Sequence, residues 1–387
     1  MTSRTRLLVL AISTPVIAFA IIGGYLGQAA PRDATYRNLA VFEDVLSLVL
    51  NNYVEEVDVR TAMSGAMRGL ADGLDPDSAY LPRELAQAAG SRAAEGQAEV
   101  GIELVRQFYL RVVSARDGSP AAKAGLRTGD YIRAIDGRPT RDMTAFEGGR
   151  LLQGAPGSKV TLLVLRGSTI DPHEITVTRE RLTAPDVTSR MANPTTGYVR
   201  VAEFTTETPA HVRQAFDALR KTGAASFVVD LRGTARGDID AGINTARLFV
   251  GSGKLAVRQL KTAREDVTAQ AADATITAPV TLLIGQGTAG AAEVFAAALD
   301  DNSRADLIGE HTLGRAARQQ LVKLPDGSGL LLTQTRYLTP KSNPIHEKGL
   351  APDVEVESPV VEFGMEPPTG DPVLDRALEQ LATKKAA

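Results

Sequence analysis

The side chains that most often carry metal or thiolate chemistry are few in this chain. It has four histidines, His173, His211, His311 and His346, and no cysteine. The histidines are scattered, and none approaches a metal-ligand spacing such as HExxH. Without cysteine there is no thiolate nucleophile, no thiolate metal site and no disulfide. The sequence therefore predicts neither a metal centre nor a bound cofactor.

The composition is that of a folded protein with more than one domain. The 387 residues are 43% hydrophobic and 23% charged, which supplies enough apolar side chains for real cores. The length allows two or three domains. Because the formal net charge is −3, we expect no broad basic face and no nucleic-acid partner.

The N-terminal residues predict export. Arg4 and Arg6 precede a long uncharged run, and basic residues before an apolar run orient a chain with its N-terminus inside. As a signal peptide, the run would end near the small residues Gly27 and Ala29. As an anchor, residues 7–26 are long enough to cross the roughly 30 Å of a bilayer's hydrocarbon core. We favour the anchor because signal-peptide cores are usually shorter, and in both cases the rest of the chain is exported.

Periodicity divides the chain further. Apolar residues at three- and four-residue steps, such as Phe42, Leu46, Val49 and Tyr53, predict helices near the N-terminus. Short β-runs between turns then predict a small open barrel, and alternating strands and helices predict an α/β domain with a largely parallel sheet. The predicted parts are a signal peptide or anchor (1–30), a helical segment (36–90), a small β-barrel with short helices (97–183), an α/β core (184–360) and a tail with a helix (361–387).

Six segments in this order resemble motifs of the bacterial carboxyl-terminal processing peptidases. In the first, Asp77 replaces the histidine of the family's LDPHSxYL. The segments are LDPDSAYL (Leu74–Leu81), SPAAKAGLRTGDYIRAIDG (Ser119–Gly137), DLR (Asp230–Arg232), GTAGAAE (Gly287–Glu293), GEHTLGRAARQ (Gly309–Gln319) and RYLTPKSNPIHEKGLAPD (Arg336–Asp353).

The resemblance implies a multidomain α/β protein: an exported N-terminus, a helical segment, a PDZ domain over 97–183 and an α/β serine-peptidase core over 184–360. It also implies a periplasmic location, with residues 7–26 in the bacterial inner membrane if they are not removed.

The catalytic residues that the resemblance implies are replaced. A serine–lysine peptidase needs a hydroxyl at a strand-to-helix turn, a neutral lysine to take its proton and backbone N–H donors for the oxyanion. Where the family has the nucleophilic serine of TASAAE, this chain has Gly290, and Arg315 stands in place of the basic lysine of TFGKG. Their separation of 25 residues agrees with the family register, and the glutamine that usually orients the lysine is present as Gln319. Glycine cannot form an acyl-enzyme, and an arginine keeps its proton at neutral pH.

The loop implied to hold the oxyanion also departs from the family. NPGG becomes Thr234–Gly237, so Arg236 replaces a glycine whose N–H helps to hold the oxyanion, next to Gly237. Ala291 still offers the other expected donor. Together the three departures predict a pseudopeptidase.

Other hydroxyls and lysines do not restore the pair. Thr288 lies two residues before Gly290, so its side chain points elsewhere, and we expect it to pack or to hold a turn. Ser303 is expected in a solvated turn after a helix. Lys323 and Lys341 lie on strand or loop segments with nothing to pair them to a hydroxyl.

The peptide-binding half is better preserved. PDZ domains bind a C-terminal peptide by strand addition and hold its carboxylate with backbone N–H groups of a small loop. The alternative is that the apolar residues in question belong only to the core. Arg236 and Arg315 either hold a carboxylate in the old cleft or pair with nearby acids. The predicted peptide-binding residues are Gly101, Ile102, Glu103, Leu104, Phe146 and Leu151.

Three functions are therefore compared. The first is a non-catalytic protein that captures protein C-termini, pairing with an active peptidase relative or protecting a client from it. The second is an active serine endopeptidase that processes C-terminal tails of periplasmic proteins. In the third, the N-terminal helices form a homo-oligomer or assembly platform.

Overall fold

The computed structural model describes residues 32–90, 97–167, 171–359, 361–363, 365 and 369–386. The predicted signal peptide or anchor, residues 1–30, lies outside these ranges. Within them, no helix combines the length and the apolar character needed to cross a bilayer. The chain divides into two compact units, residues 1–67 and 68–387.

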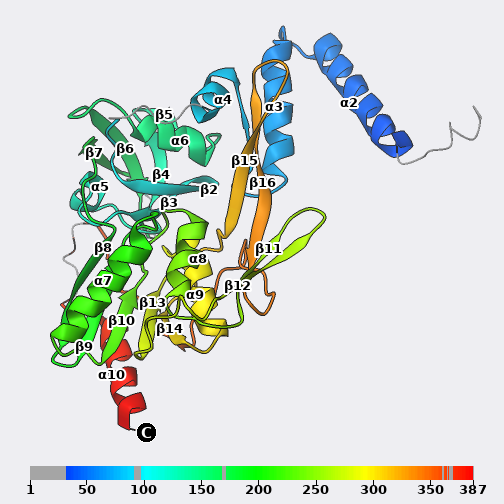
Figure 1. The fold of residues 1–387 in the computed structure, drawn as a ribbon. Coiled ribbons are helices and arrows are strands. Elements are labelled where there is room, and N and C mark those ends of the chain that lie inside the picture. Colours follow the sequence, from blue (N-terminus) through cyan, green and yellow to red (C-terminus); the bar gives the residue numbers. More distant parts are fainter. Residues whose placement is uncertain are drawn as a thin grey trace, which may run out of the picture. The chain divides into compact units, whose positions relative to one another are not determined.

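The described part of the first unit is helical. Helix α2 spans Arg32–Asn52, and α3 spans Val59–Asp72 and continues into the second unit (Figure 1). Phe42, Val49 and Tyr53, three residues of the predicted apolar seam, are exposed. Self-association through this seam stays a prediction.

The second unit begins with two short elements, of which the sequence analysis missed the strand. Strand β1 (Ala79–Leu81) and the separate short helix α4 (Arg83–Gly90) lie in the part predicted only as a helical segment (36–90), so the strand there is new. The carboxylate of Asp75 accepts a hydrogen bond from Asp77 N at 3.0 Å, which turns the chain from helix towards strand. β1 then pairs antiparallel with the distant strand β16 (Gly329–Leu338). Three buried residues are too few to show a period in the sequence.

An antiparallel sheet forms the predicted small barrel. Its strand order is β2-β3-β4-β6-β7, with β5 paired to β4, so β2 is an edge strand. Along β6, Val160, Leu162 and Val164 are fully buried and the residues between them are partly exposed, as expected for a strand with one face on a core. The elements are β2 (Ile102–Gln107), β3 (Tyr109–Ala115), α5 (Pro120–Lys123), β4 (Tyr131–Ile135), β5 (Arg138–Pro139), α6 (Ala145–Leu152), β6 (Lys159–Leu165) and β7 (His173–Thr178).

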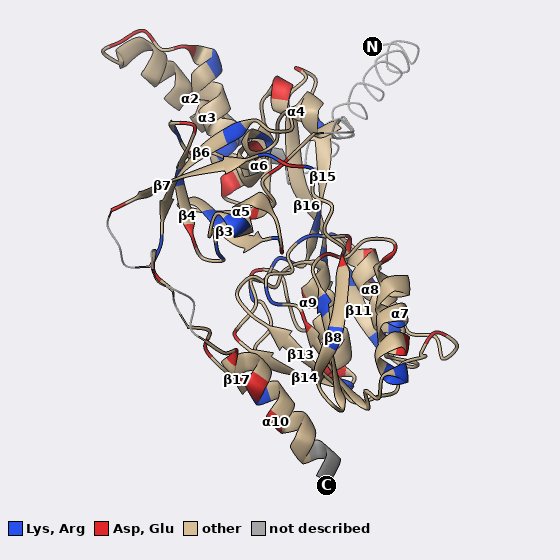
Figure 2. Ribbon diagram, turned by 90° about the vertical axis from the view of Figure 1, so that its left-hand side faces the viewer, with Lys and Arg blue, Asp and Glu red and all other residues tan. Residues whose placement is uncertain are grey.

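The largely parallel sheet of the core is confirmed. Its order is β17-β14-β13-β10-β9-β8, and only the β8–β9 pair is antiparallel. Helices α7, α8 and α9 pack on one face, and α10 packs on the other against Val228, Leu283 and Ile308 (Figures 1 and 2). The elements are β8 (Val187–Asn193), β9 (Thr196–Val201), α7 (Thr208–Lys221), β10 (Ser226–Asp230), α8 (Ile239–Arg247), β13 (Val280–Ile284), α9 (Ala291–Asp301), β14 (Ala305–Gly309), β17 (Val354–Glu355) and α10 (Pro372–Ala386).

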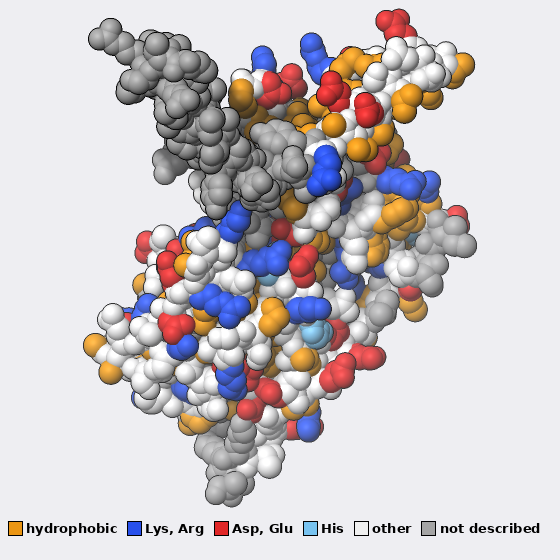
Figure 3. Space-filling view, turned by 90° about the vertical axis from the view of Figure 1, so that its right-hand side faces the viewer, with side chains coloured by type: hydrophobic (Ala, Val, Ile, Leu, Met, Phe, Trp, Pro, Cys, Tyr) orange, Lys and Arg blue, Asp and Glu red, His pale blue; other side chains and the backbone are white. Residues whose placement is uncertain are grey.

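A second, antiparallel sheet of the core was not predicted. Its order is β1-β16-β11-β12, and β15 also pairs with β16. The sheet holds together segments from both ends of the second unit, which no local pattern reveals. Its other strands are β11 (Lys254–Gln259), β12 (Arg264–Thr268) and β15 (Ala317–Lys323). On the face in Figure 3, basic and acidic side chains are interspersed.

Candidate functional site

The turn from β13 into α9 places Gly290 at the N-cap of the helix. Its backbone has φ 62° and ψ −116°, a conformation that costs an L-residue strain. A Cβ built there would meet the carbonyl oxygen of Arg315 at 3.8 Å, which is ordinary contact. The turn therefore has space for a side chain, but its backbone favours glycine.

Glu293, one turn into α9, ties this turn to the loop that carries Arg315. Its carboxylate is fully buried and accepts four hydrogen bonds. Burial raises the pKa of Glu293, and the four donors oppose that rise. Glu293 thus ties the turn at Gly290 to the loop that carries Thr312, Gly314 and Arg315. The donors are Thr312 Oγ1 (2.5 Å), Gly314 N (2.6 Å), Arg315 N (2.7 Å) and Gly290 N (3.0 Å).

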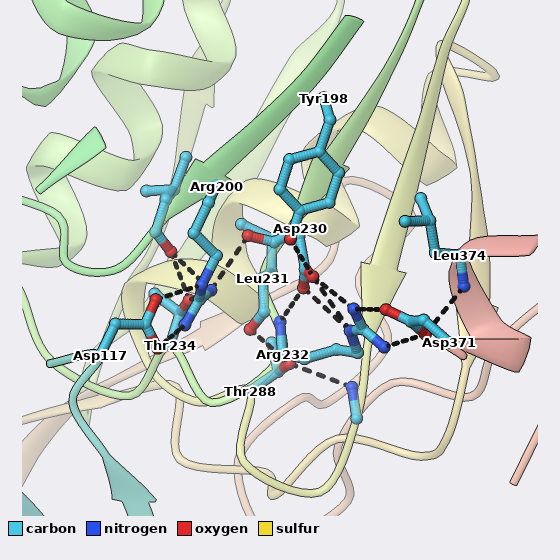
Figure 4. Close-up of polar contacts among 12 residues, drawn as sticks. Asp117, Tyr198, Arg200, Asp230, Leu231, Arg232, Thr234, Thr288, Asp371 and Leu374 are labelled. Atoms are coloured by element: carbon cyan, nitrogen blue, oxygen red, sulfur yellow. Dashed lines mark hydrogen bonds and ion pairs between the residues drawn. The ribbon is translucent and has the colours of Figure 1, made fainter. Parts of the chain in front are cut away.

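The hydroxyl of Thr288 is engaged in holding the turn. It donates to the carbonyl of Leu231 at 2.8 Å and accepts from Gly285 N at 3.1 Å (Figure 4). The side chain is fully buried, which fits the structural role expected for it. Ser303 is exposed and its N–H bonds to Asp300 O at 2.7 Å, in a turn.

The DLR motif fastens the sheet to α10. The guanidinium of Arg232 lies 2.6 Å from both Asp230 and Asp371, and Tyr198 donates to Asp230 at 2.7 Å (Figure 4). The pKa of Arg232 is raised: burial alone would lower it, and the bonds to Asp371 and Asp230 outweigh that effect. These residues stabilise the core and leave no free group for catalysis of their own.

The guanidinium of Arg315 lies between Asp77 and strand β2. Its Nε lies 2.8 Å from Asp77 Oδ1, and its Nη1 donates to the carbonyl of Leu104 at 3.2 Å. The Asp77 side chain is 4% exposed and that of Arg315 is 26% exposed. Gln319, expected to orient the residue at position 315, instead donates to Thr333 Oγ1 at 3.3 Å.

Arg236 is surrounded by carboxylates. Its Nη1 lies 2.6 Å from Glu99, and its Nε lies 3.5 Å from Glu203 and 3.8 Å from Glu103. The pKa of Arg236 is raised: burial alone would lower it, and these acids outweigh that effect. Burial raises the pKa of Glu103, and the nearby arginines oppose the rise. Both arginines pair with nearby acids, as one of the two expectations for them had it; that they hold a ligand's carboxylate stays a prediction.

Gly237, after Arg236, is required by packing. Its φ is 132°, and a Cβ there would lie 2.6 Å from the backbone nitrogen of Phe204. The loop therefore depends on glycine at this position.

A cavity of about 250 Å³ lies beside strand β2 of the PDZ domain, and Arg236 and Arg315 also line it. Leu151 is partly buried against the PDZ core and is not in the lining of this cavity, whereas its neighbour Leu152 is; a role for Leu151 in peptide binding stays a prediction. Gly237, Gly290 and Ala291 lie outside the lining of this described cavity. Predicted residues that line it together are Gly101, Ile102, Glu103, Leu104, Phe146, Arg236, Arg315 and Gln319.

The sequence analysis missed the acids that hold the two arginines. Asp77 was visible as a departure from the family motif, but its partner was not. Glu99 and Glu203 were not among the predicted site residues. Ala79 of β1 and Leu331 of β16 also line the cavity, because β1 pairs with β16. Within the described residues, no group of histidines and carboxylates has the arrangement of a metal site.

A PDZ sheet joined to an α/β core of this topology defines a PDZ-containing serine-peptidase fold. Residues 195–356 match the model of peptidase family S41, and residues 111–166 match that of the PDZ domain. The chain is 34% identical to the carboxyl-terminal-processing protease of Synechocystis sp., over 66% of this chain and 60% of that protein. It is 31% identical to the carboxy-terminal-processing protease of Bartonella bacilliformis, over 85% of this chain and 77% of that protein.

A solved structure agrees with these matches. The photosystem II D1 C-terminal processing protease superposes with a TM-score of 0.70 and 31% identity, covering 81% of this chain and 87% of that one. The chain belongs to peptidase family S41, among the carboxyl-terminal processing peptidases.

Proposed function

We propose that this protein captures the C-termini of other proteins through its PDZ domain and does not cleave them. The observation that carries the proposal is the pair of replacements at positions 290 and 315. Gly290 has no hydroxyl, and Arg315 is held by Asp77 at 2.8 Å. An arginine keeps its proton at neutral pH and cannot serve as the base. Losing the nucleophile or the base of a serine protease costs about 10⁶-fold in turnover.

Capture is supported by β2, an edge strand that pairs only with β3 among the described strands, and by the loop before it. A C-terminal peptide adds to such an edge as another strand, and backbone N–H groups hold its carboxylate. Gly101 in the loop has φ 81°, and Ile102 and Leu104 line the adjoining cavity. The alternative, that these residues serve only the core, is tested by binding.

The second candidate is an active serine endopeptidase that processes C-terminal tails. It is favoured by the relatives above, which are named as proteases. It would need another nucleophile, since the Thr288 hydroxyl is bonded on both sides. Labelling by a serine-directed fluorophosphonate would support this candidate.

The deciding experiment is proteolysis of casein by the purified full-length chain and by two revertants. The first revertant is Gly290→Ser/Arg315→Lys. The second adds Asp77→His, because a lysine facing the Asp77 carboxylate would keep its proton. We expect the wild-type chain to be inert and the triple revertant to be the more active of the two. Casein cleavage by the wild type that a fluorophosphonate abolishes would refute the proposal.

We also propose that the protein is exported, on the strength of Arg4, Arg6 and the uncharged run after them. Protease added to intact spheroplasts should digest the described domains if they lie outside the inner membrane. Protection until the cells are lysed would refute export.

A further inference from the structure

The free edge of β2 exposes the peptide groups of Leu104. Leu104 faces Val112 across the β2–β3 pair. The N–H of Val112 bonds to Asp130 O at 2.8 Å, and its carbonyl accepts from Gly129 N at 2.9 Å. Two residues opposite each other in an antiparallel pair either exchange backbone hydrogen bonds or both direct their N–H and C=O groups away from each other. The peptide groups of Leu104 therefore face the free edge, where Arg315 reaches its carbonyl.

This geometry sets the direction of a captured tail. The carboxylate loop precedes β2, so the tail's last residue lies at the start of the strand and the tail runs antiparallel to it. Every second residue of β2 directs its peptide N–H and C=O groups towards this edge. Ile102 then pairs with the last residue of the tail, Leu104 with the third from last and Arg106 with the fifth from last. Upstream residues continue towards Gln107.

A second, larger cavity lies where the upstream residues would emerge. It measures about 690 Å³, and Val105, Arg106 and Gln107 of β2 form part of its lining. Arg315 and Asp77 line both cavities. A tail that follows β2 past this ion pair therefore passes from the smaller cavity into the larger one.

The charges around the larger cavity are unequal. Of the three arginines that line its described part, Arg106 and Arg315 are each paired with an aspartate. The third, Arg111, donates to the neutral side chain of Gln286 at 2.9 Å. Against them stand four glutamates; one, Glu347, lies 3.9 Å from Arg336, and the other three still leave the lining with an excess of negative charge. The four are Glu310, Glu347, Glu355 and Glu357.

His346 is a second, independent sign of a ligand here. It is 6% exposed and lines the larger cavity. Neither of its ring nitrogens has a hydrogen-bond partner within the described structure, although buried polar groups are nearly always bonded. Burial lowers the pKa of His346, so its neutral ring can accept an N–H from a ligand.

We propose that the larger cavity binds a lysine- or arginine-rich stretch of the captured protein, starting about five residues before its C-terminus. The glutamates attract the basic side chains, and His346 accepts an N–H of the tail. This inference rests on the proposed capture of C-termini and names the class of client.

The test uses four fluorescent peptides and the purified full-length chain. All share the same apolar last three residues. At the fifth to eighth positions from the end, one carries lysines, one serines and one glutamates. A fourth peptide, the serine peptide with an amidated C-terminus, reports on carboxylate capture. Affinity is measured by fluorescence anisotropy for the wild type and for Glu355→Gln/Glu357→Gln, with Glu174→Gln/Glu265→Gln on β7 and β12 as the matched control.

We expect the lysine peptide to bind about fivefold more tightly than the glutamate peptide, less so at high salt. Glu355→Gln/Glu357→Gln should remove most of this preference, and the control pair should not. If the serine peptide binds but the lysine and glutamate peptides bind equally, the basic-tail inference is wrong and capture stands. If no peptide binds, or amidation changes nothing, capture itself is wrong and the inference falls with it.

Discussion

Arg315 and Asp77 form an ion pair, with Nε 2.8 Å from Oδ1, in the lining of the cavity beside strand β2 of the PDZ domain. Both residues are departures from the family's motifs, and they neutralise each other. Because Asp77 offsets the charge of Arg315, Arg315 and Arg236 can line the same cavity. Arg315 also occupies part of the edge of β2, because its Nη1 donates a hydrogen bond to the carbonyl of Leu104.

The ion pair should contribute to stability. Arg315→Ala leaves the Asp77 carboxylate, 4% exposed, without its partner, and we expect a cost of about 2–4 kcal/mol. Arg315→Gln/Asp77→Asn should cost less than the sum of its single substitutions. Urea unfolding followed by circular dichroism measures both. Arg318→Ala is the control, because its ion pairs with Asp238 and Asp240 join side chains that are 44% to 57% exposed, and such surface pairs should be worth less than about 1 kcal/mol. An equal loss for Arg315→Ala and Arg318→Ala would contradict the prediction.

The bond from Arg315 to Leu104 should weaken peptide capture. A peptide N–H must replace the guanidinium at this carbonyl, so Arg315→Gln/Asp77→Asn should bind the serine peptide about tenfold more tightly. Titration by fluorescence anisotropy reads this directly, with Arg318→Gln/Asp240→Asn as a surface control. Unchanged or weaker binding would show that Arg315 does not close the edge.

The backbone at position 290 should oppose any side chain. At φ 62° and ψ −116°, Gly290→Ser should cost about 1–3 kcal/mol with the fold retained. Thermal unfolding measures the loss. The control is Gly149→Ser in helix α6, where a Cβ added to the glycine would have nothing within 4 Å, and this substitution should cost no stability. A neutral Gly290→Ser would mean that the turn relaxes.

The glycine of the neighbouring loop should be less replaceable. In Gly237→Ala a Cβ meets the backbone of Phe204 in addition to the strain of φ 132°. We expect about 3–5 kcal/mol, since clash and strain add. Urea unfolding should rank Gly237→Ala above Gly290→Ser, and the reverse order would refute the packing argument.

Asp300 should make stability depend on pH. Burial, Asp353 and Asp301 raise its pKa from 3.8 to about 6. Between these values the native state binds more protons than the unfolded state, so this group's contribution makes stability fall as the pH rises. At pH 7, Asp300→Asn should therefore be more stable than the wild type by about 1 kcal/mol, allowing for partial exposure. The gain should vanish below about pH 4. Unfolding at several pH values, beside the exposed Asp142→Asn, checks this, and a gain independent of pH would contradict it.

Local pattern was sufficient for most of the architecture. The hydrophobic pattern of α7 arises because one face of the helix is buried, and that of β10 because the strand is covered on both sides. Both patterns can be recognised from neighbouring residues in the sequence. The replacements at Gly290 and Arg315 were likewise visible from residue type and spacing alone.

Only the tertiary structure decided what the replaced residues contact. Asp77 and Arg315 are far apart in the sequence, and they meet because the chain runs from the turn at Asp75 into β1, which pairs with β16. Contacts between distant segments depend on how whole elements pack, and no local period records them. The sequence by itself determined the order of the domains and which residues depart from the family's motifs, and packing decided which carboxylates pair with the arginines and which strand edge Arg315 contacts.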